Sequence, residues 1–72
     1  MLNMEQFGRR LSNLRHKQQL TQRDIAEYCC VSVQAVSKWE TGKSCPDVLM
    51  LDDLAKILRV EIKDLFEEQK SS

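Results

Sequence analysis

The chain has 72 residues, and its 11 Lys or Arg residues balance its 11 Asp or Glu residues, so the formal net charge at pH 7 is zero. A chain of this length forms one small domain with a single core and little room for an enclosed reaction site. Zero net charge argues against a protein that coats nucleic acid indiscriminately and against a membrane-surface peptide. The sequence has no secretory leader and no apolar run of membrane-spanning length, so we expect a cytoplasmic protein with no membrane partner.

The charges are unevenly placed along the chain. Residues 1–46 hold seven Lys or Arg against four Asp or Glu, a net +3, whereas residues 47–72 hold four against seven, a net −3. A basic N-terminal part would face phosphates while the acidic C-terminal part faces away from them. Because such differences also arise by chance, the split favours nucleic-acid binding only modestly.

The first predicted helix opens at Asn3 or Met4. Phe7, Leu11 and Leu14 recur at i, i+4 and i+7, which gives this helix one buried face. We expect the basic residues of the same segment to lie outside the core; they are Arg9, Arg10 and Lys17.

Two short helix patterns follow, separated by a tight corner at residues 29–32. Thr21 is the predicted N-cap of the first, and Asp24 completes a pattern close to a capping box. Ser32 is the predicted N-cap of the second, which extends to about Thr41. Two short helices joined by such a corner predict a helix-turn-helix.

The outer face of the second helix has the chemistry that base edges require. We expect four of its side chains to be unburied: Val33, Gln34, Ser37 and Lys38. Together they offer a small apolar group, groups that both donate and accept hydrogen bonds, and a cation, which is the mixture that reads a major groove. The alternative is an ordinary solvated face, because Gln, Ser and Lys are common surface residues.

The rest of the chain predicts two further helices. Gly42 is expected as a C-cap and Pro46 in the next helix's first turn. The fourth helix has a core stripe at Leu51, Leu54, Ala55 and Leu58, and the short fifth carries Ile62, Leu65 and Phe66. The fourth also carries a surplus of apolar residues, which indicates either a partner surface or a thicker core; these are Val48, Leu49, Met50 and Ile57. We expect one domain over residues 1–66 and a polar tail or linker over 67–72.

The three cysteines do not form a recognisable framework. Cys29 and Cys30 are adjacent, Cys45 is fifteen residues further on, and neither a CxxC spacing nor a nearby His supports a zinc site. We expect Cys29 in the core and the other two partly exposed in corners. No constellation for catalysis can be assembled from the sequence, so we expect neither an enzyme nor a cofactor or metal.

These residues, in this register, resemble the lambda-repressor-like (Cro/C1-type) helix-turn-helix family. The matching positions cover nearly all of the chain: Thr21-Gln22, Ile25-Ala26, Val31-Ser32, Val36-Ser37, Glu40 with Gly42-Lys43, Pro46, Leu54-Ala55 and Val60 to Leu65. The resemblance implies an all-α, compact five-helix domain. It also implies that Arg15 pairs with Glu40, which is plausible because a carboxylate at a helix C-terminus gains from a bidentate cation.

The sequence departs from the family at the corner and again after the fourth helix. Family members usually have Gly at the position of Cys30, where the chain turns with positive φ, so the corner is either strained by about 1 kcal/mol or differently shaped. Arg59 and Glu61 replace the Gly and the Ser or Thr cap that are more common in the family.

The resemblance implies sequence-specific DNA binding by a transcriptional regulator, most often a repressor. The helix at about 33–41 would contact bases through Val33, Gln34, Ser37 and Lys38. Phosphates would be contacted by Gln22, Ser32 and Lys43. We expect a homodimer on double-stranded DNA, with an additional protein partner possible. The alternatives are an antitoxin that uses the same DNA-binding face and a protein-interaction adaptor with this fold.

Overall fold

The computed structural model describes residues 3–66, and in this range the chain forms four α-helices and one 3₁₀ turn. They are α1 (Met4–Lys17), α2 (Gln22–Cys29), α3 (Val33–Glu40), α4 (Val48–Leu58) and η1 (Ile62–Leu65). The all-α class and the central helix-turn-helix are confirmed, and the expected fifth helix is a single 3₁₀ turn. The expected tail over residues 67–72 lies outside the described residues.

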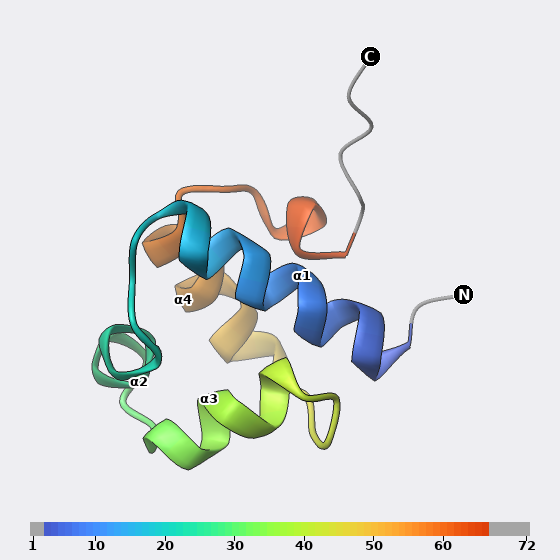
Figure 1. Ribbon diagram of the computed structural model, residues 1–72. Coiled ribbons are helices and arrows are strands. Elements are labelled where there is room, and N and C mark those ends of the chain that lie inside the picture. The colour runs from blue at the N-terminus through green and yellow to red at the C-terminus, as the bar shows by residue number, and fades with distance from the viewer. Residues whose placement is uncertain (1–2, 67–72) are drawn as a thin grey trace.

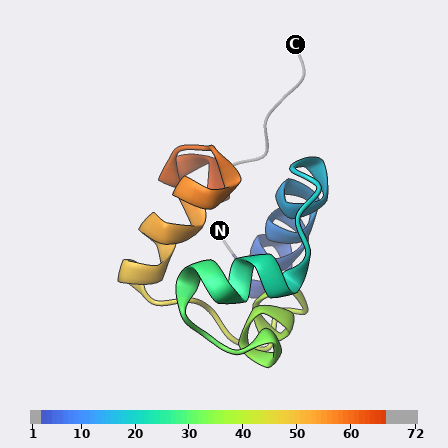
Figure 2. The ribbon, with the colours of Figure 1, turned by 90° about the vertical axis from the view of Figure 1, so that its left-hand side faces the viewer.

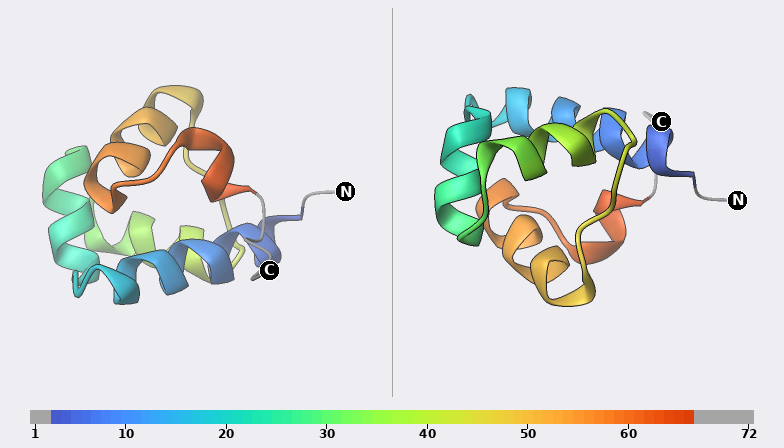
Figure 3. Two further views of the ribbon diagram at one scale, coloured as in Figure 1. Left: turned by 90° about the horizontal axis from the view of Figure 1, so that it is seen from above. Right: turned by 90° about the horizontal axis from the view of Figure 1, so that it is seen from below.

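The long helix α1 runs above α3, and these two helices make the largest contact in the fold (Figure 1). Helix α2 lies across one end of the molecule and packs on both α3 and α4 (Figure 2). Seen from below, α3 is the element nearest the viewer, with α1 behind it (Figure 3). The second helix of the helix-turn-helix therefore lies on the outside of the fold.

Each α-helix starts at a side chain that accepts a hydrogen bond from the backbone three residues on. The four N-caps are Asn3, Thr21, Ser32 and Asp47, with oxygen–nitrogen distances of 2.7, 3.0, 3.1 and 2.9 Å. At α2 the capping box is complete, because the Thr21 N–H also donates to Asp24 Oδ2 (2.8 Å). This bond holds the pKa of Asp24 below its usual value. Each cap satisfies an N–H that has no acceptor within its helix.

The prediction that Pro46 lies in the first turn of the fourth helix was wrong, because α4 begins two residues later, at Val48. Asp47 caps α4, so Pro46 precedes the cap and lies outside the first turn. Gly42, in turn, follows the cap residue Thr41 and has φ +79°. Around it the Lys43 N–H donates to the Lys38 carbonyl (2.9 Å), which is the hydrogen bond of a Schellman motif.

The core forms from the apolar stripes of all five elements, and the buried set is Phe7, Leu11, Leu14, Ile25, Ala26, Cys29, Val36, Trp39, Leu54, Ala55, Leu58 and Leu65. The expected core positions are confirmed with three exceptions. Leu51 is half-buried, while Ile62, at the start of η1, and Phe66, which follows η1, are exposed. Burial raises the pKa of the Cys29 thiol to about 11.

The apolar surplus of α4 divides between the two expectations. Met50 and Ile57 are partly buried and pack against the core. Val48 and Leu49, in the first turn, are each 79% exposed.

Among residues 3–66, three residues other than glycine adopt left-handed backbone conformations: Gln19, Cys30 and Arg59. Cys30 has φ 59° and ψ 43°, and the Val31 N–H that follows it donates to the Ala26 carbonyl (2.9 Å). Arg59 has φ 60° at the end of α4, where the Val60 N–H donates to the Ala55 carbonyl (3.0 Å). The corner therefore keeps the positive φ that favours Gly and places a Cβ there, so the strained alternative applies.

Candidate nucleic-acid interface

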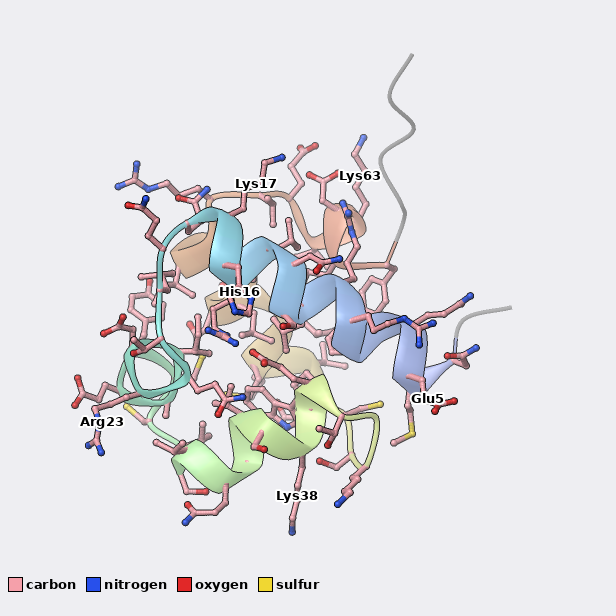
Figure 4. The ribbon with its side chains drawn as sticks, in the orientation of Figure 1. Glu5, His16, Lys17, Arg23, Lys38 and Lys63 are labelled. Atoms are coloured by element: carbon pink, nitrogen blue, oxygen red, sulfur yellow. The ribbon has the colours of Figure 1, made fainter. Side chains whose placement is uncertain are left out.

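The outward face of α3 is centred on Gln34 and Lys38, one helical turn apart. Both side chains are exposed, and neither makes a hydrogen bond to another described residue. Lys38 points away from the body of the molecule, opposite the side that carries Lys63 (Figure 4). The other face of the helix is fixed in the core by Val36 and Trp39. The core thus sets the direction in which Gln34 and Lys38 point.

Val33 and Ser37 form the edge of this face. Both are half-buried, and Val33 packs partly against the core. Of the four side chains expected on the outer face, two are exposed and two are half-buried. None of the four is buried or capped by another part of residues 3–66.

The three predicted phosphate ligands are placed differently. Ser32 is exposed, and its Oγ accepts from the Ala35 N–H (3.1 Å), which leaves the hydroxyl proton free to be donated. Lys43 is exposed in the loop after α3, and its backbone is fixed by the bond to Lys38. Gln22, at the start of α2, is half-buried, and its Nε2 donates to Glu40 Oε1 (3.0 Å). The sequence did not predict this contact.

Arg15 and Glu40 form the ion pair that the resemblance implied. Arg15 Nε lies 2.6 Å from Glu40 Oε2, and Arg15 Nη2 lies 3.1 Å from Oε1, so the contact is bidentate. Arg15 Nη1 also donates to the Leu20 carbonyl (2.9 Å). The two side chains are 11% and 7% exposed. Because Glu40 is the last residue of α3, this pair ties the end of that helix to α1 and to the turn that follows α1.

Both glycines of the chain lie where α1 meets α3. A Cβ on Gly8 would lie 2.5 Å from the Glu40 carbonyl oxygen and 2.6 Å from that of Trp39. A Cβ on Gly42 would lie 3.0 Å from the Cα of Glu5. The close approach at Gly8 was not predicted, although a glycine inside a helix pattern indicates one, because glycine is otherwise unfavourable within a helix.

The expectation that Arg10 lies outside the core was wrong. It is half-buried, and its Nε donates to the Asp64 carbonyl in η1 (2.8 Å). Its Nη2 is buried with no hydrogen-bond partner among residues 3–66. Arg10 therefore joins α1 to η1.

The cysteines are placed as the sequence predicted. All three are free thiols in the described structure; Cys29 is buried, and Cys30 and Cys45 are exposed. Within the same range no three His, Cys, Asp or Glu side chains gather as a metal site would require. Nor does any of the described helices combine the length and the apolar character needed to span a bilayer.

A helix-turn-helix whose second helix presents exposed polar groups, next to exposed residues suited to phosphate, is the architecture of a class of DNA-binding domains. A helix-turn-helix family model (HTH_3) matches residues 11–65. The chain belongs to this Cro/C1-type family, whose members bind double-stranded DNA.

Individual proteins show the same likeness. The chain is 40% identical over 60 residues to the HTH-type transcriptional activator BcrR of Enterococcus faecalis, a match that covers 83% of this chain and 29% of that protein. The restriction-modification controller protein C.AhdI of Aeromonas hydrophila has a TM-score of 0.82 at 28% identity, covering 88% of this chain and 96% of that one. The clp gene regulator ClgR of Corynebacterium glutamicum has a TM-score of 0.83 at 26% identity, covering 90% and 69%. The chain thus spans less than a third of BcrR and nearly all of C.AhdI.

Proposed function

We propose that this chain binds specific DNA sequences and regulates transcription, with α3 in the major groove and its N-terminal end foremost. The observation that carries the proposal is the free outer face of α3, where Gln34 and Lys38 are exposed while Val36 and Trp39 fix the helix from behind. A helix held in this way can enter a groove without rearrangement of the core.

The base contacts follow from the donors and acceptors of each side chain. The Gln34 amide can pair with N6 and N7 of adenine, and Lys38 can donate to guanine. Val33 can contact a thymine methyl, and Ser37 can serve a base or a phosphate. Because Gln34 and Lys38 are the most exposed of the four, we assign most of the sequence preference to them.

The backbone contacts come from both ends of α3 and from α2. We assign phosphates to Ser32 and Lys43, which flank α3, and to Gln22, which begins α2. These contacts fix the position of the domain on the duplex and carry no sequence information directly.

One such domain reads only a few base pairs, so we propose that it binds as a homodimer on half-sites about 34 Å apart. We further propose that it represses, because a bound dimer that covers a promoter can exclude polymerase without a second functional surface. BcrR is named an activator. A promoter reporter assay distinguishes repression from activation, because repression predicts lower reporter expression when the chain is present.

The exposed apolar residues Val48 and Leu49 support a second candidate function, in which this surface binds another protein, as in an antitoxin or an adaptor. An antitoxin would keep the DNA contact, and a toxin gene next to its own would identify it. An adaptor would not bind DNA.

Selection of bound duplexes from a random pool, repeated at two salt concentrations, tests the proposal. We expect one enriched motif, with affinity that falls steeply as salt rises because phosphate contacts release counterions. A pool with no enriched motif would contradict sequence-specific binding, and binding that ignores salt would contradict the phosphate assignments.

A further inference from the structure

The carboxylate of Glu40 joins three parts of the structure. It accepts two hydrogen bonds from Arg15 of α1 and one from Nε2 of Gln22 at the start of α2 (3.0 Å). Glu40 itself ends α3. The stabilising ion pair and a predicted phosphate ligand therefore share one acceptor.

This contact fixes which way the Gln22 amide faces. A carboxylate only accepts hydrogen bonds, so the amide nitrogen, and not its oxygen, is directed at Glu40. One of the two amide N–H groups is used in this bond, and the second is free to be donated elsewhere. A glutamine that was not held would spread its amide over several rotamers, and binding would have to select one of them.

The other hydrogen-bond donors at the N-terminal end of α2 are also suited to an anion such as a phosphate. The backbone N–H groups of Gln22 and Arg23 lie in the first turn, where no intrahelical acceptor exists, and the Arg23 side chain projects from α2 into solvent (Figure 4). The positive end of the helix dipole adds to this preference for an anion. A held Gln22 amide adds a side-chain donor of fixed direction to these groups.

Arg15 reduces the repulsion that the Glu40 carboxylate would otherwise exert on a nearby phosphate. Its bidentate contact with Glu40, at 2.6 and 3.1 Å, neutralises the charge and leaves the carboxylate as a hydrogen-bond acceptor. Glu40 can therefore hold Gln22 beside DNA without strong repulsion of the backbone.

We propose that Glu40 is a positioning residue for DNA binding, and that it acts by holding the Gln22 amide so that its second N–H meets a backbone phosphate. This inference rests on the proposed DNA-binding function and adds to it a link between the ion pair and the phosphate contact. The ion pair then serves both folding and binding.

A mutant cycle with a charge-balanced background separates positioning from general damage. In the double variant Arg15→Met/Glu40→Met the two lost charges cancel, and apolar side chains of similar size leave no unpaired buried ion, so the fold should persist. Gln22→Ala is then made in the wild type and in this background. Affinity for the selected duplex is measured for all four proteins, with circular dichroism to confirm folding.

We expect Gln22→Ala to lower affinity about five- to tenfold in the wild type, the usual net worth of one hydrogen bond, and less than about twofold in the Met background. Base preference and salt slope should not change, because Gln22 is neutral and contacts no base. Gln18→Ala, at the exposed glutamine that follows the last residue of α1, is the matched control and should bind like the wild type.

Equal losses in both backgrounds would overturn the positioning role alone. A wild-type chain that binds no duplex would overturn the proposed function and this inference with it. A second measurement uses only the wild type and holds even where the Met background does not fold. By NMR relaxation the side-chain NH₂ group of Gln22 should be more rigid than that of Gln18, and equal mobility would refute the inference.

Discussion

The two faces of the eight-residue helix α3 differ in their surroundings: the inner face packs in the fold and the outer face is open to solvent. On the inner face Val36 and Trp39 are buried, and Glu40 is tied to Arg15 and Gln22. On the outer face Gln34 and Lys38 are exposed, and their side chains make no hydrogen bond or ion pair within the described structure. Changes on the inner face should therefore cost stability, and changes on the outer face should cost binding alone.

The largest expected effect is on the inner face. Arg15→Ala or Glu40→Ala should each lower the free energy of unfolding by about 2 to 4 kcal/mol, because either change leaves a nearly buried charge without its partner. Chemical denaturation of both single variants and the double variant measures the coupling, and a coupling energy of zero would refute the pair.

The control is a carboxylate–cation pair at the surface of α4. Asp52 Oδ2 and Lys56 Nζ lie 3.1 Å apart on α4 with side chains 55% and 62% exposed. Asp52→Ala should leave stability nearly unchanged, because water and salt screen an exposed pair.

Gly8→Ala should destabilise by about 1 to 3 kcal/mol, the usual range for overpacking. A methyl group at this position would collide with the backbone carbonyls of Trp39 and Glu40 and push α1 and α3 apart. The direction is informative, because Gly to Ala inside a helix ordinarily stabilises. The control is Asn13→Ala, on the exposed side of α1, which should raise the melting temperature slightly. A Gly8→Ala variant with the same increase would show that α1 and α3 can move apart at little cost.

On the outer face, Gln34→Ala should weaken binding to the best site by about 1 to 3 kcal/mol and relax the preference at one base pair. Stability should not change, because the side chain contacts nothing that folding requires. Binding titrations against the selected duplex and its single-base variants, together with a melting curve, measure both. Unchanged affinity for the best site would show that the reading face is wrongly assigned.

Lys43→Ala should have a smaller and different effect. Affinity should fall alike for all sequences, and the slope of log affinity against log salt should become less steep by about one, because one phosphate contact is lost. A variant with an unchanged slope would place Lys43 away from the backbone. Lys63→Ala, on the opposite side of the molecule, is the control (Figure 4).

The smallest effect is expected at the corner between α2 and α3. Cys30→Gly should stabilise by about 0.5 to 1 kcal/mol, because the left-handed conformation is unfavourable for a residue with a Cβ. Arg59→Gly, at the equivalent position after α4, should act in the same direction. A lower melting temperature for the Cys30 variant would mean that the thiol contributes more than the backbone strain costs.

Local patterns predicted most of the fold. The caps Thr21 and Ser32, the stripe of Phe7, Leu11 and Leu14, and the helix boundaries all depend on neighbours within four residues, which a sequence displays directly. The errors lie where a side chain's surroundings come from a distant segment. Arg10 looks like any surface residue of α1 until η1, 54 positions later, is folded against it.

The same division holds for the candidate site. Gln34 and Lys38 could be placed on the outer face from helix periodicity, and Arg15 with Glu40 from the family resemblance. The bond between Gln22 and Glu40 spans 18 positions and two helices, and no spacing rule predicts it. Whether Val33 and Ser37 are free or half covered depends on how neighbouring elements pack, so the sequence could name them and could not rank them.

The absence of a side chain at Gly8 has a genetic consequence. If α3 reads an operator as we propose, a screen for alleles that lose operator control should recover changes at the Gly8 codon alongside changes on the outer face of α3. Such alleles would tilt or loosen α3 from behind. Suppressors would then be sought at the end of α3, where the displaced carbonyls lie, and not among the residues that we propose contact DNA.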